Sequence, residues 1–230
     1  MNDIENSQKD YDFKNVLKHD WWILLVLVGL LIEAVLVYPH LPAQVPFHWN
    51  IDGQVDRYAA RSVGAFFPPV LTAVVYAGLA LLPLIDPKRA SYPRFDEAYG
   101  MIRSGLVLFL TVVYEVTIVI GLGYTLNVPM IILAGLGLFI IMIGNRMGQF
   151  RHNYFVGIKT PWTLASEEVW NRTHRMAAWL WVAGGLVCLG AAFLPGRIAF
   201  ILFLSAMAVI ALVPIIYSAV IYKKPESQDK

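Results

Sequence analysis

The fold is decided by the last long stretch of the chain, MAAWLWVAGGLVCLGAAFLPGRIAFILFLSAMAVIALVPIIYSAVIY at residues 176–222, whose single charged residue is Arg197. A run of about 20 apolar residues matches the hydrocarbon thickness of a lipid bilayer, and this stretch holds one such run on each side of Arg197. The dipeptide Pro195-Gly196 supplies the tight corner between them. The pattern therefore predicts two membrane-spanning helices, over 176–194 and 198–222.

Further apolar runs of similar length precede this stretch. Residues 104–145 are too long for one helix and hold two of them, because Asn127 and Pro129 supply turn chemistry in the middle. Charged residues make up 15% of the chain, whereas a soluble domain has roughly 25%. We therefore expect an all-α integral membrane protein with six transmembrane helices, the first two of them over 21–38 and 64–85.

The distribution of Lys and Arg predicts the orientation of these helices. Of the 18 Lys and Arg residues, only Arg57, Arg61 and Arg197 fall on one side of the expected membrane. The positive-inside rule places the other side in the cytoplasm, so both termini are expected there, in a multi-pass protein of the bacterial cytoplasmic membrane.

The chain is expected to divide into four parts. These are a cytoplasmic tail at 1–20, a first membrane region at 21–126 with an outer loop at 39–63, a second membrane region at 127–222 with a cytoplasmic loop at 148–175, and a cytoplasmic tail at 223–230.

The expected outer loop combines prolines with turn-forming residues. Prolines at positions 39, 42 and 46 forbid a regular helix, while Asn50 and Gly53 supply turn chemistry. His48, Asn50 and Asp52 alternate and would face one way in an extended chain, which makes a metal site one interpretation. One histidine with one carboxylate and one amide falls short of a zinc ligand set, however. The favoured interpretation is a metal-free, compact loop that caps the helices, with Trp49 at the membrane interface.

The expected cytoplasmic loop is far longer than a helix connection needs, and long ordered loops are usually functional. Aromatic residues interleave with Lys and Arg along it, a mixture that suits an acidic inner-leaflet surface. Thr163 or Ser166 can cap a new helix, with Glu167 and Glu168 in its first turn, where the helix dipole favours acids. That helix would run on into the fifth span. A plain surface hairpin followed by a helix end is the alternative interpretation.

Two motifs in these loops resemble a known family. The inner run NYFVGIKTPWTLASEEVW at residues 153–170, followed by NRTHR, is similar to the hallmark of the SdpI family of bacterial membrane proteins. The outer pattern P-x-H-W-N-x-x-G at residues 46–53 resembles an uncharacterised membrane domain that often accompanies it. One departure is Lys159, where the family more often has Arg. If that position holds a bidentate partner, Lys would be a weaker substitute. The positions that carry the resemblance are Asn153, Gly157, Lys159, Thr160, Pro161, Trp162, Thr163, Trp170 and Asn171 inside, and Pro46, His48, Trp49, Asn50 and Gly53 outside.

The resemblance implies a non-enzymatic membrane protein without a cofactor. Such a protein would confer resistance to a membrane-active peptide toxin met by the outer loop, or signal to a repressor-type protein met by the inner loop, or do both. In this reading Gly157 and Pro161 fix the turn of the inner loop, and Lys159 presents a charge. Trp162 and Trp170 would anchor the loop at the lipid headgroups. Hydrogen bonds from Asn153, Thr160 and Thr163 would hold its backbone.

Two acidic residues inside the expected spans favour a different function. Glu33 and Glu115 are the ionisable groups placed well within the apolar runs, and intramembrane carboxyl groups usually face the bundle interior or water. They could relay protons or cations in a small transporter, or they could lock two helices by hydrogen bonding. Glycines in the fourth and fifth spans, including Gly137 and Gly185, permit close helix packing.

Composition and motifs argue against other classes. A net charge of +2 is too small to indicate a nucleic-acid partner. The chain has no zinc-protease, nucleophile-elbow or phosphate-loop motif, so we expect no enzyme activity. A membrane enzyme that uses the region around His48 is a third alternative.

Overall fold

The computed structural model describes residues 11–223, so parts of both expected tails lie outside the described residues. Its elements, in chain order, are α1 (Phe13–His19), α2 (Trp21–Val37), the 3-10 helix η1 (Tyr38–His40), β1 (Gln44–Trp49), β2 (Val55–Ala60), α3 (Arg61–Ile85), the 3-10 helix η2 (Arg89–Arg94), α4 (Asp96–Gly121), α5 (Val128–Met147), α6 (Pro161–Ala165), α7 (Glu167–Ala191) and α8 (Gly196–Lys223).

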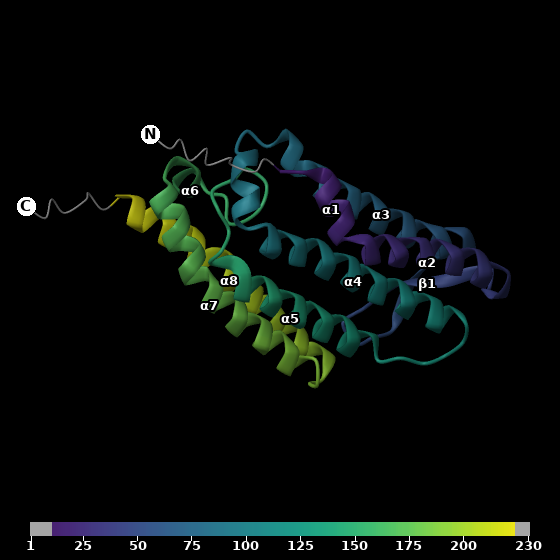
Figure 1. Ribbon diagram of the computed structural model, residues 1–230. Helices are drawn as coiled ribbons and strands as arrows, with labels where there is room; N and C mark the ends of the chain where they lie inside the picture. Colours follow the sequence, from purple (N-terminus) through teal and green to yellow (C-terminus); the bar gives the residue numbers. More distant parts are fainter. Residues whose placement is uncertain (1–10, 224–230) are drawn as a thin grey trace, which may run out of the picture.

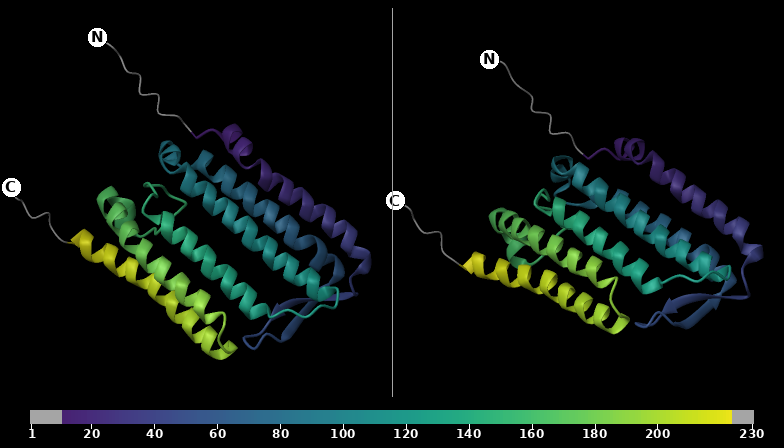
Figure 2. Two further views of the ribbon diagram at one scale, coloured as in Figure 1. Left: turned by 60° about the horizontal axis from the view of Figure 1, so that its bottom comes forward. Right: turned by 90° about the horizontal axis from the view of Figure 1, so that it is seen from below.

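The long helices α2, α3, α4, α5, α7 and α8 lie side by side (Figure 1). In Figure 2, α1, α6 and the carboxyl end of α8 lie at one end of this bundle, and β1 and β2 lie at the other. Within the described residues, α2, α3, α4, α5 and α8 are long and apolar enough to cross a membrane. The chain is therefore a mostly helical, multi-pass membrane protein, as the sequence predicted. The fifth expected span corresponds to the second part of α7, whose first turns carry charged residues.

Local sequence signals determine where several helices begin. The Asn127 side chain accepts a hydrogen bond from the backbone N–H of Met130 and so caps α5. The Ser166 hydroxyl accepts one from Val169 and caps α7, with Glu167 in its first turn. The prediction that Ser166 could begin this helix is confirmed. Thr163, the other candidate, belongs instead to the short helix α6.

Helices α5 and α7 pack with their backbones in close contact. A Cβ atom added at Gly137 would lie 2.8 Å from the backbone nitrogen of Leu189 on α7. A Cβ atom added at Gly185 would lie 2.7 Å from the carbonyl oxygen of Gly137. Small residues allow this approach, which the sequence pattern predicted for these two spans.

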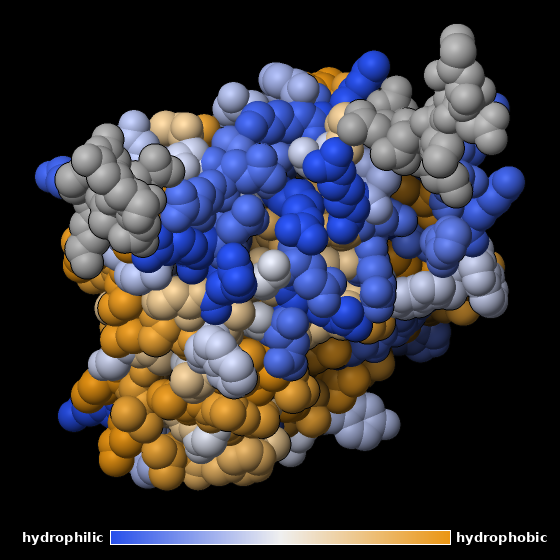
Figure 3. Space-filling model, turned by 60° about the vertical axis from the view of Figure 1, so that its left-hand side comes forward, coloured by the Kyte–Doolittle hydropathy of each residue, from blue (hydrophilic) through white to orange (hydrophobic). Residues whose placement is uncertain are grey.

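The outer surface is apolar along the helices and polar at the ends. Long apolar side chains such as Val35, Val74 and Ile216 are exposed on α2, α3 and α8, as expected for helices that face lipid. Figure 3 shows hydrophilic residues gathered over the end of the molecule that carries α6, with hydrophobic residues on the flank below.

The expected outer loop is not irregular but contains a two-stranded antiparallel sheet. Strand β1 pairs with β2 from Gln44↔Ala60 to Trp49↔Val55, with irregular register next to His48. The prediction of an all-α protein is therefore incomplete, because it lacked this small sheet. Prolines obscured the strand in the sequence, because Pro lacks the N–H that a ladder needs. The fully buried side chain of Val45 packs over the ends of α3 and α4, so this hairpin does cap the helices, as expected.

A buried ion pair connects the first helices, and the sequence analysis did not foresee it. Asp20, at the start of α2, accepts a hydrogen bond of 2.9 Å from Nε of Arg103 on α4, and both side chains are almost fully buried. The Tyr76 hydroxyl of α3 donates to the same carboxylate at 3.3 Å. A buried charge needs a paired and hydrogen-bonded partner, so this contact fixes how α2, α3 and α4 meet.

Candidate functional site

The loop between α5 and α7, which the sequence predicts to be cytoplasmic, is built around the buried side chain of Asn153. Its amide nitrogen donates to the carbonyl oxygens of Arg151 and Val156, at 2.8 and 2.9 Å. Its amide oxygen accepts from the backbone N–H groups of Phe155 and Val156, at 2.9 and 2.7 Å. One side chain thus closes a tight turn, which explains why an amide and not a carboxylate stands here.

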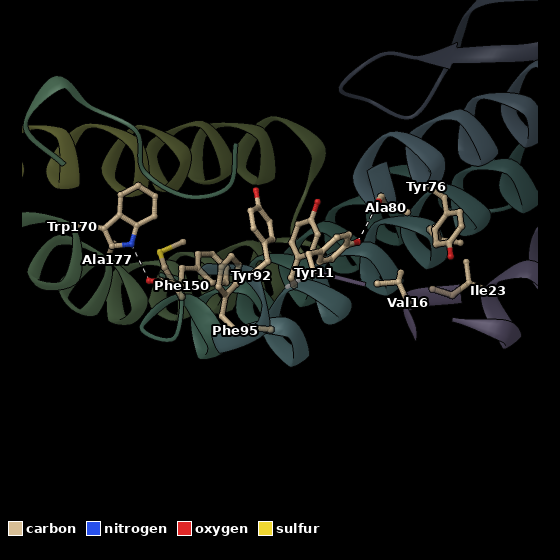
Figure 4. Packing of buried hydrophobic residues seen from close by; sticks show 14 of the residues in the cluster. Tyr11, Val16, Ile23, Tyr76, Ala80, Tyr92, Phe95, Phe150, Trp170 and Ala177 are labelled. Carbon is tan, nitrogen blue, oxygen red and sulfur yellow. Dashed lines mark hydrogen bonds between the residues drawn. The ribbon is translucent and has the colours of Figure 1, made fainter. Parts of the chain in front are cut away.

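The next part of the loop packs on α7 through Gly157. This glycine has a φ of +121°, and an added Cβ atom would overlap Nε2 of His174. His174 stacks on Trp170, with ring centroids 4.1 Å apart. The Trp170 indole N–H donates to the carbonyl oxygen of Phe150 at 2.9 Å, as drawn in Figure 4. Trp170 is completely buried, so the expectation that it anchors the loop at lipid headgroups is wrong.

The hydrogen bonds of His174 identify its protonation state. Nε2 accepts from the backbone N–H of Ile158 at 2.9 Å, so Nδ1 carries the proton and donates to the carbonyl oxygen of Trp170 at 2.8 Å. The ring is therefore neutral. Burial lowers the pKa of His174 to about 4, in agreement with this arrangement.

Helix α6 is closed by a reciprocal pair of threonines. The Thr160 hydroxyl accepts from the backbone N–H of Thr163, and the Thr163 hydroxyl accepts from the backbone N–H of Thr160, at 3.1 and 2.8 Å. Both side chains are buried. The Thr160 hydroxyl also hydrogen-bonds the Ser218 hydroxyl of α8 at 3.0 Å. This capping box therefore holds the loop against the last helix.

A second set of contacts joins this loop to the loop between α3 and α4. The buried carboxylate of Asp86 accepts from the backbone N–H of Tyr154 and from the Tyr92 hydroxyl, both at 3.0 Å. Nearby, Lys88 Nζ donates to Nδ1 of His152 at 2.7 Å. Burial, followed by the neighbouring Lys88 ammonium, lowers the pKa of His152. The loop between α3 and α4 and the loop between α5 and α7 thus form one ordered layer.

The predicted loop residues fall into a buried set and an exposed set. Asn153, Thr160, Thr163 and Trp170 are buried and hold the loop together. Lys159 is exposed, and its ammonium donates to the carbonyl oxygen of Phe155 at 3.0 Å. The remaining predicted positions are exposed at Pro161 and partly buried at Gly157, Trp162 and Asn171.

The predicted outer residues gather in the hairpin. The Asn50 side-chain oxygen accepts from the backbone N–H groups of Asp52 and Gln54, at 3.0 and 2.9 Å, and organises the turn. Gly53 has a φ of +78° and packs against Pro129. His48 points to Asp56, 2.6 Å from Nδ1 to Oδ1, and not toward Asn50 or Asp52. The remaining members, Pro46 and Trp49, lie in β1 and are buried and partly buried.

The two intramembrane acids meet across a helix interface. Glu33 of α2 and Glu115 of α4 lie close enough for their charges to act on each other. The sequence predicted that Glu115 lies near the middle of the third span. In the structure it lies six residues before Gly121, the last residue of α4, and so nearer the hairpin end of that helix. Both carboxyl groups are partly buried.

Sequence reasoning missed several residues that build this site. Asp86, His152 and Ser218 contact the loop from distant parts of the chain, and no local pattern reports such contacts. His174 had a weak signal, because it follows Trp170 by four residues and lies on the same helix face.

Comparisons with known proteins agree with this description. Residues 149–218 match the SdpI/YfhL protein family, and residues 24–73 match a domain of unknown function, DUF1648. The chain is 27% identical over 201 residues to Immunity protein SdpI of Bacillus subtilis (strain 168), an alignment that covers 87% of this chain and 91% of that protein. No solved structure matches. The resemblance to the SdpI family expected from the sequence is therefore confirmed.

Proposed function

We propose, from this similarity, that the chain is a non-enzymatic protein of a bacterial cytoplasmic membrane that confers resistance to a membrane-active peptide toxin, signals to a cytoplasmic repressor, or does both. The similar protein of Bacillus subtilis is named an immunity protein, and its alignment includes most of both chains. The observation that carries the proposal is the loop at 148–175, whose buried signature residues are joined by hydrogen bonds while Lys159 and Pro161 are exposed.

The proposal includes six spans with both termini in the cytoplasm. Helix α7 packs along α5 at backbone distance, as the two glycine contacts show. Beyond its charged first turns, Trp179, Leu186 and Val187 are exposed on its surface, as expected where a helix faces lipid. These features support α7 as a sixth span.

Helix α8 offers a direct physical connection between the two faces of the membrane. At its outer end, an added Cβ atom at Gly196 would overlap the carbonyl oxygen of Ile51 at the tip of the hairpin. At its inner end, Ser218 holds the capping-box residue Thr160. A ligand that displaced the hairpin tip would therefore act on the helix that supports the cytoplasmic loop. This arrangement supports a receptor better than a passive structural role.

The exposed face of the loop supplies the recognition surface. Lys159 and Tyr154 are exposed in this loop, and Trp162 is partly exposed. The Lys159 ammonium is held over the loop by its bond to Phe155, so its charge has a fixed position. We assign this face to the cytoplasmic partner.

The test is the loss of one exposed charge. Lys159→Ala should lower survival of a toxin-sensitive host at least tenfold when the cells meet the peptide toxin, while membrane level and thermal unfolding stay unchanged. Lys159→Arg should keep protection, because the charge remains and the family more often has Arg at this position. The matched control is Arg94→Ala, which removes an exposed cytoplasmic charge outside the loop. Full protection by Lys159→Ala would contradict the proposal.

A small proton- or cation-coupled transporter is the second candidate, and the contact between Glu33 and Glu115 supports it. Transport predicts that Glu115→Gln abolishes activity at normal expression. A helix-locking role predicts that the same variant stays active, because the amide keeps its hydrogen-bonding capacity. Measuring toxin survival and ion uptake into liposomes for this one variant separates the two functions.

A further inference from the structure

The loop between α3 and α4 meets the loop between α5 and α7 through two contacts of different chemistry. In the first, the Asp86 carboxylate accepts a hydrogen bond of 3.0 Å from the backbone N–H of Tyr154. In the second, the Lys88 ammonium donates to Nδ1 of His152 at 2.7 Å. An ammonium only donates, so the second contact exists only while Nδ1 of His152 carries no proton. Histidine is also the side chain whose charge ordinarily changes between pH 5 and 8.

The His152 ring is buried but incompletely hydrogen-bonded. It is 6% exposed and lies against the Trp170 ring, with centroids 5.1 Å apart. Because Nδ1 accepts from Lys88, the proton of the neutral ring is on Nε2, which has no hydrogen-bond partner among the described residues. A buried N–H without a partner costs about 1–3 kcal/mol. Packing on Trp170 and the single bond from Lys88 therefore hold the ring in place.

The charged groups around His152 come from both sides of the contact. The Asp86 and Glu167 carboxylates favour a charged ring, whereas burial and the Lys88 ammonium oppose it. His174, on the far face of Trp170, is neutral and adds no charge. Burial is the largest of these influences, so the pKa of His152 is lowered from its ordinary value of 6.5. At neutral pH the ring is therefore uncharged and able to accept from Lys88.

We propose that the contact between Lys88 and His152 is an acid-sensitive latch between the two loops. When a proton binds Nδ1, Lys88 loses its acceptor and two positive charges face each other, so the ring leaves Trp170 and enters water. The contact between Asp86 and Tyr154 does not use the ring and acts as the pivot. The latch is closed at neutral pH and opens as pH falls.

The opening is confined to the first part of the loop between α5 and α7. Beyond Tyr154, the Asn153 amide oxygen holds the turn through the N–H groups of Phe155 and Val156. Further along, the Thr160 hydroxyl is bonded to the last helix. These contacts contain no group that gains a proton with His152. The latch is thus a local device, and it does not depend on the proposed function.

The distance between the two loops tests the latch directly. Nitroxide labels are attached to Ala90→Cys and Arg151→Cys, exposed positions with one on each loop, after the buried free cysteine is removed by Cys188→Ala. Dipolar EPR of the full chain in detergent then gives the distribution of label distances at a series of pH values. We expect a narrow distribution at pH 7.5 that broadens toward longer distances in at least half of the molecules by pH 4.5, with a midpoint below pH 6.5.

Variants of the two partners separate the latch from other acid effects. His152→Gln keeps an acceptor for Lys88 and does not titrate, so the distribution should stay narrow at every pH. Lys88→Met removes the donor and should give the broad distribution already at pH 7.5, whereas Arg94→Met, at an exposed position of the same loop, should behave as the unmodified chain. His174→Gln should keep the acid step. A distribution that does not change with pH, an acid step that remains in His152→Gln, or a narrow distribution in Lys88→Met would overturn the proposal. Because the assay needs no toxin, its failure is distinct from failure of the immunity function.

Discussion

At Gly157 two independent constraints meet. Its φ of +121° is a backbone conformation that residues with a Cβ atom rarely adopt. The space where that Cβ atom would stand is occupied by Nε2 of His174 and by the Trp170 ring. The His174 ring cannot withdraw without losing the hydrogen bond from Ile158. A glycine is therefore required here for both backbone and packing reasons.

We predict that Gly157→Ala lowers the free energy of unfolding by about 2 kcal/mol or more, from backbone strain and overpacking together. Thermal unfolding of the purified protein in detergent measures this. Gly148→Ala, in the same loop, is the control, because an added Cβ atom there meets only Cγ of Arg175 at an ordinary 3.6 Å. Equal unfolding temperatures for the two variants would contradict the argument.

The neutral ring of His174 makes the stability of the loop between α5 and α7 depend on pH. Protonation would place a hydrogen on Nε2, opposite the N–H of Ile158, so the folded protein resists it. Burial lowers the pKa of His174 to about 4 from an ordinary value of 6.5. Between these two values the unfolded chain binds more protons than the folded chain, so stability falls as pH decreases through that window.

We predict that His174→Gln removes part of this acid sensitivity, since Gln can accept from Ile158 but does not titrate. The stability of the unmodified protein should fall by up to about 1.4 kcal/mol per pH unit more steeply than that of the variant, between about pH 6.5 and pH 4. Chemical unfolding at several pH values measures the difference. His19→Gln, at an exposed position, should leave the slope unchanged; an identical slope in His174→Gln would show that His174 is not responsible.

At the scale of helices, the contact between α5 and α7 supports the loop that joins them. The two backbones approach so closely that side chains cannot intervene at Gly137 and Gly185. Backbone atoms of a helix cannot move aside as a flexible side chain can, so the packing there has no tolerance for an added carbon.

We predict that Gly185→Ala weakens this pair of helices, whereas Gly190→Ala in the same helix does not. A Cβ atom at position 185 would lie 2.7 Å from the Gly137 oxygen, while one at position 190 would meet nothing within 4 Å. The second change should even stabilise α7 slightly, by up to about 1 kcal/mol, from helix propensity. Unfolding in a denaturing detergent series compares the two variants, and equal destabilisation would refute the packing argument.

Across the whole molecule, the features that the sequence predicted are those that depend on local pattern. Apolar runs located the helices, and Ser166 and Asn127 marked helix starts through hydrogen bonds to residues three positions away. The pair of Glu33 and Glu115 and the ion pair of Asp20 with Arg103 join residues more than 80 positions apart, and no local pattern in the sequence reports which helices are neighbours. The orientation prediction placed Arg103 among the charges of the cytoplasmic side, so its burial against Asp20 was not expected.

The last prediction concerns the number of spans, because α7 decides whether the two ends of the chain share one side of the membrane. If α7 crosses, then Lys159 and Pro195 lie on opposite sides and Lys223 returns to the side of Lys159. If α7 lies at the surface, Pro195 shares the side of Lys159. The contact between Ile51 of the hairpin and Gly196 favours crossing, since it places the start of α8 at the hairpin end.

Reporter fusions after Lys18, Arg94, Lys159 and Lys223 should behave as cytoplasmic, and fusions near Gln54 and Pro195 as external. An external Lys159 would reverse the orientation, and a cytoplasmic Pro195 would reduce the count to five spans and separate the hairpin from α8. Such a separation would remove the physical connection through which an outer ligand could act on the inner loop.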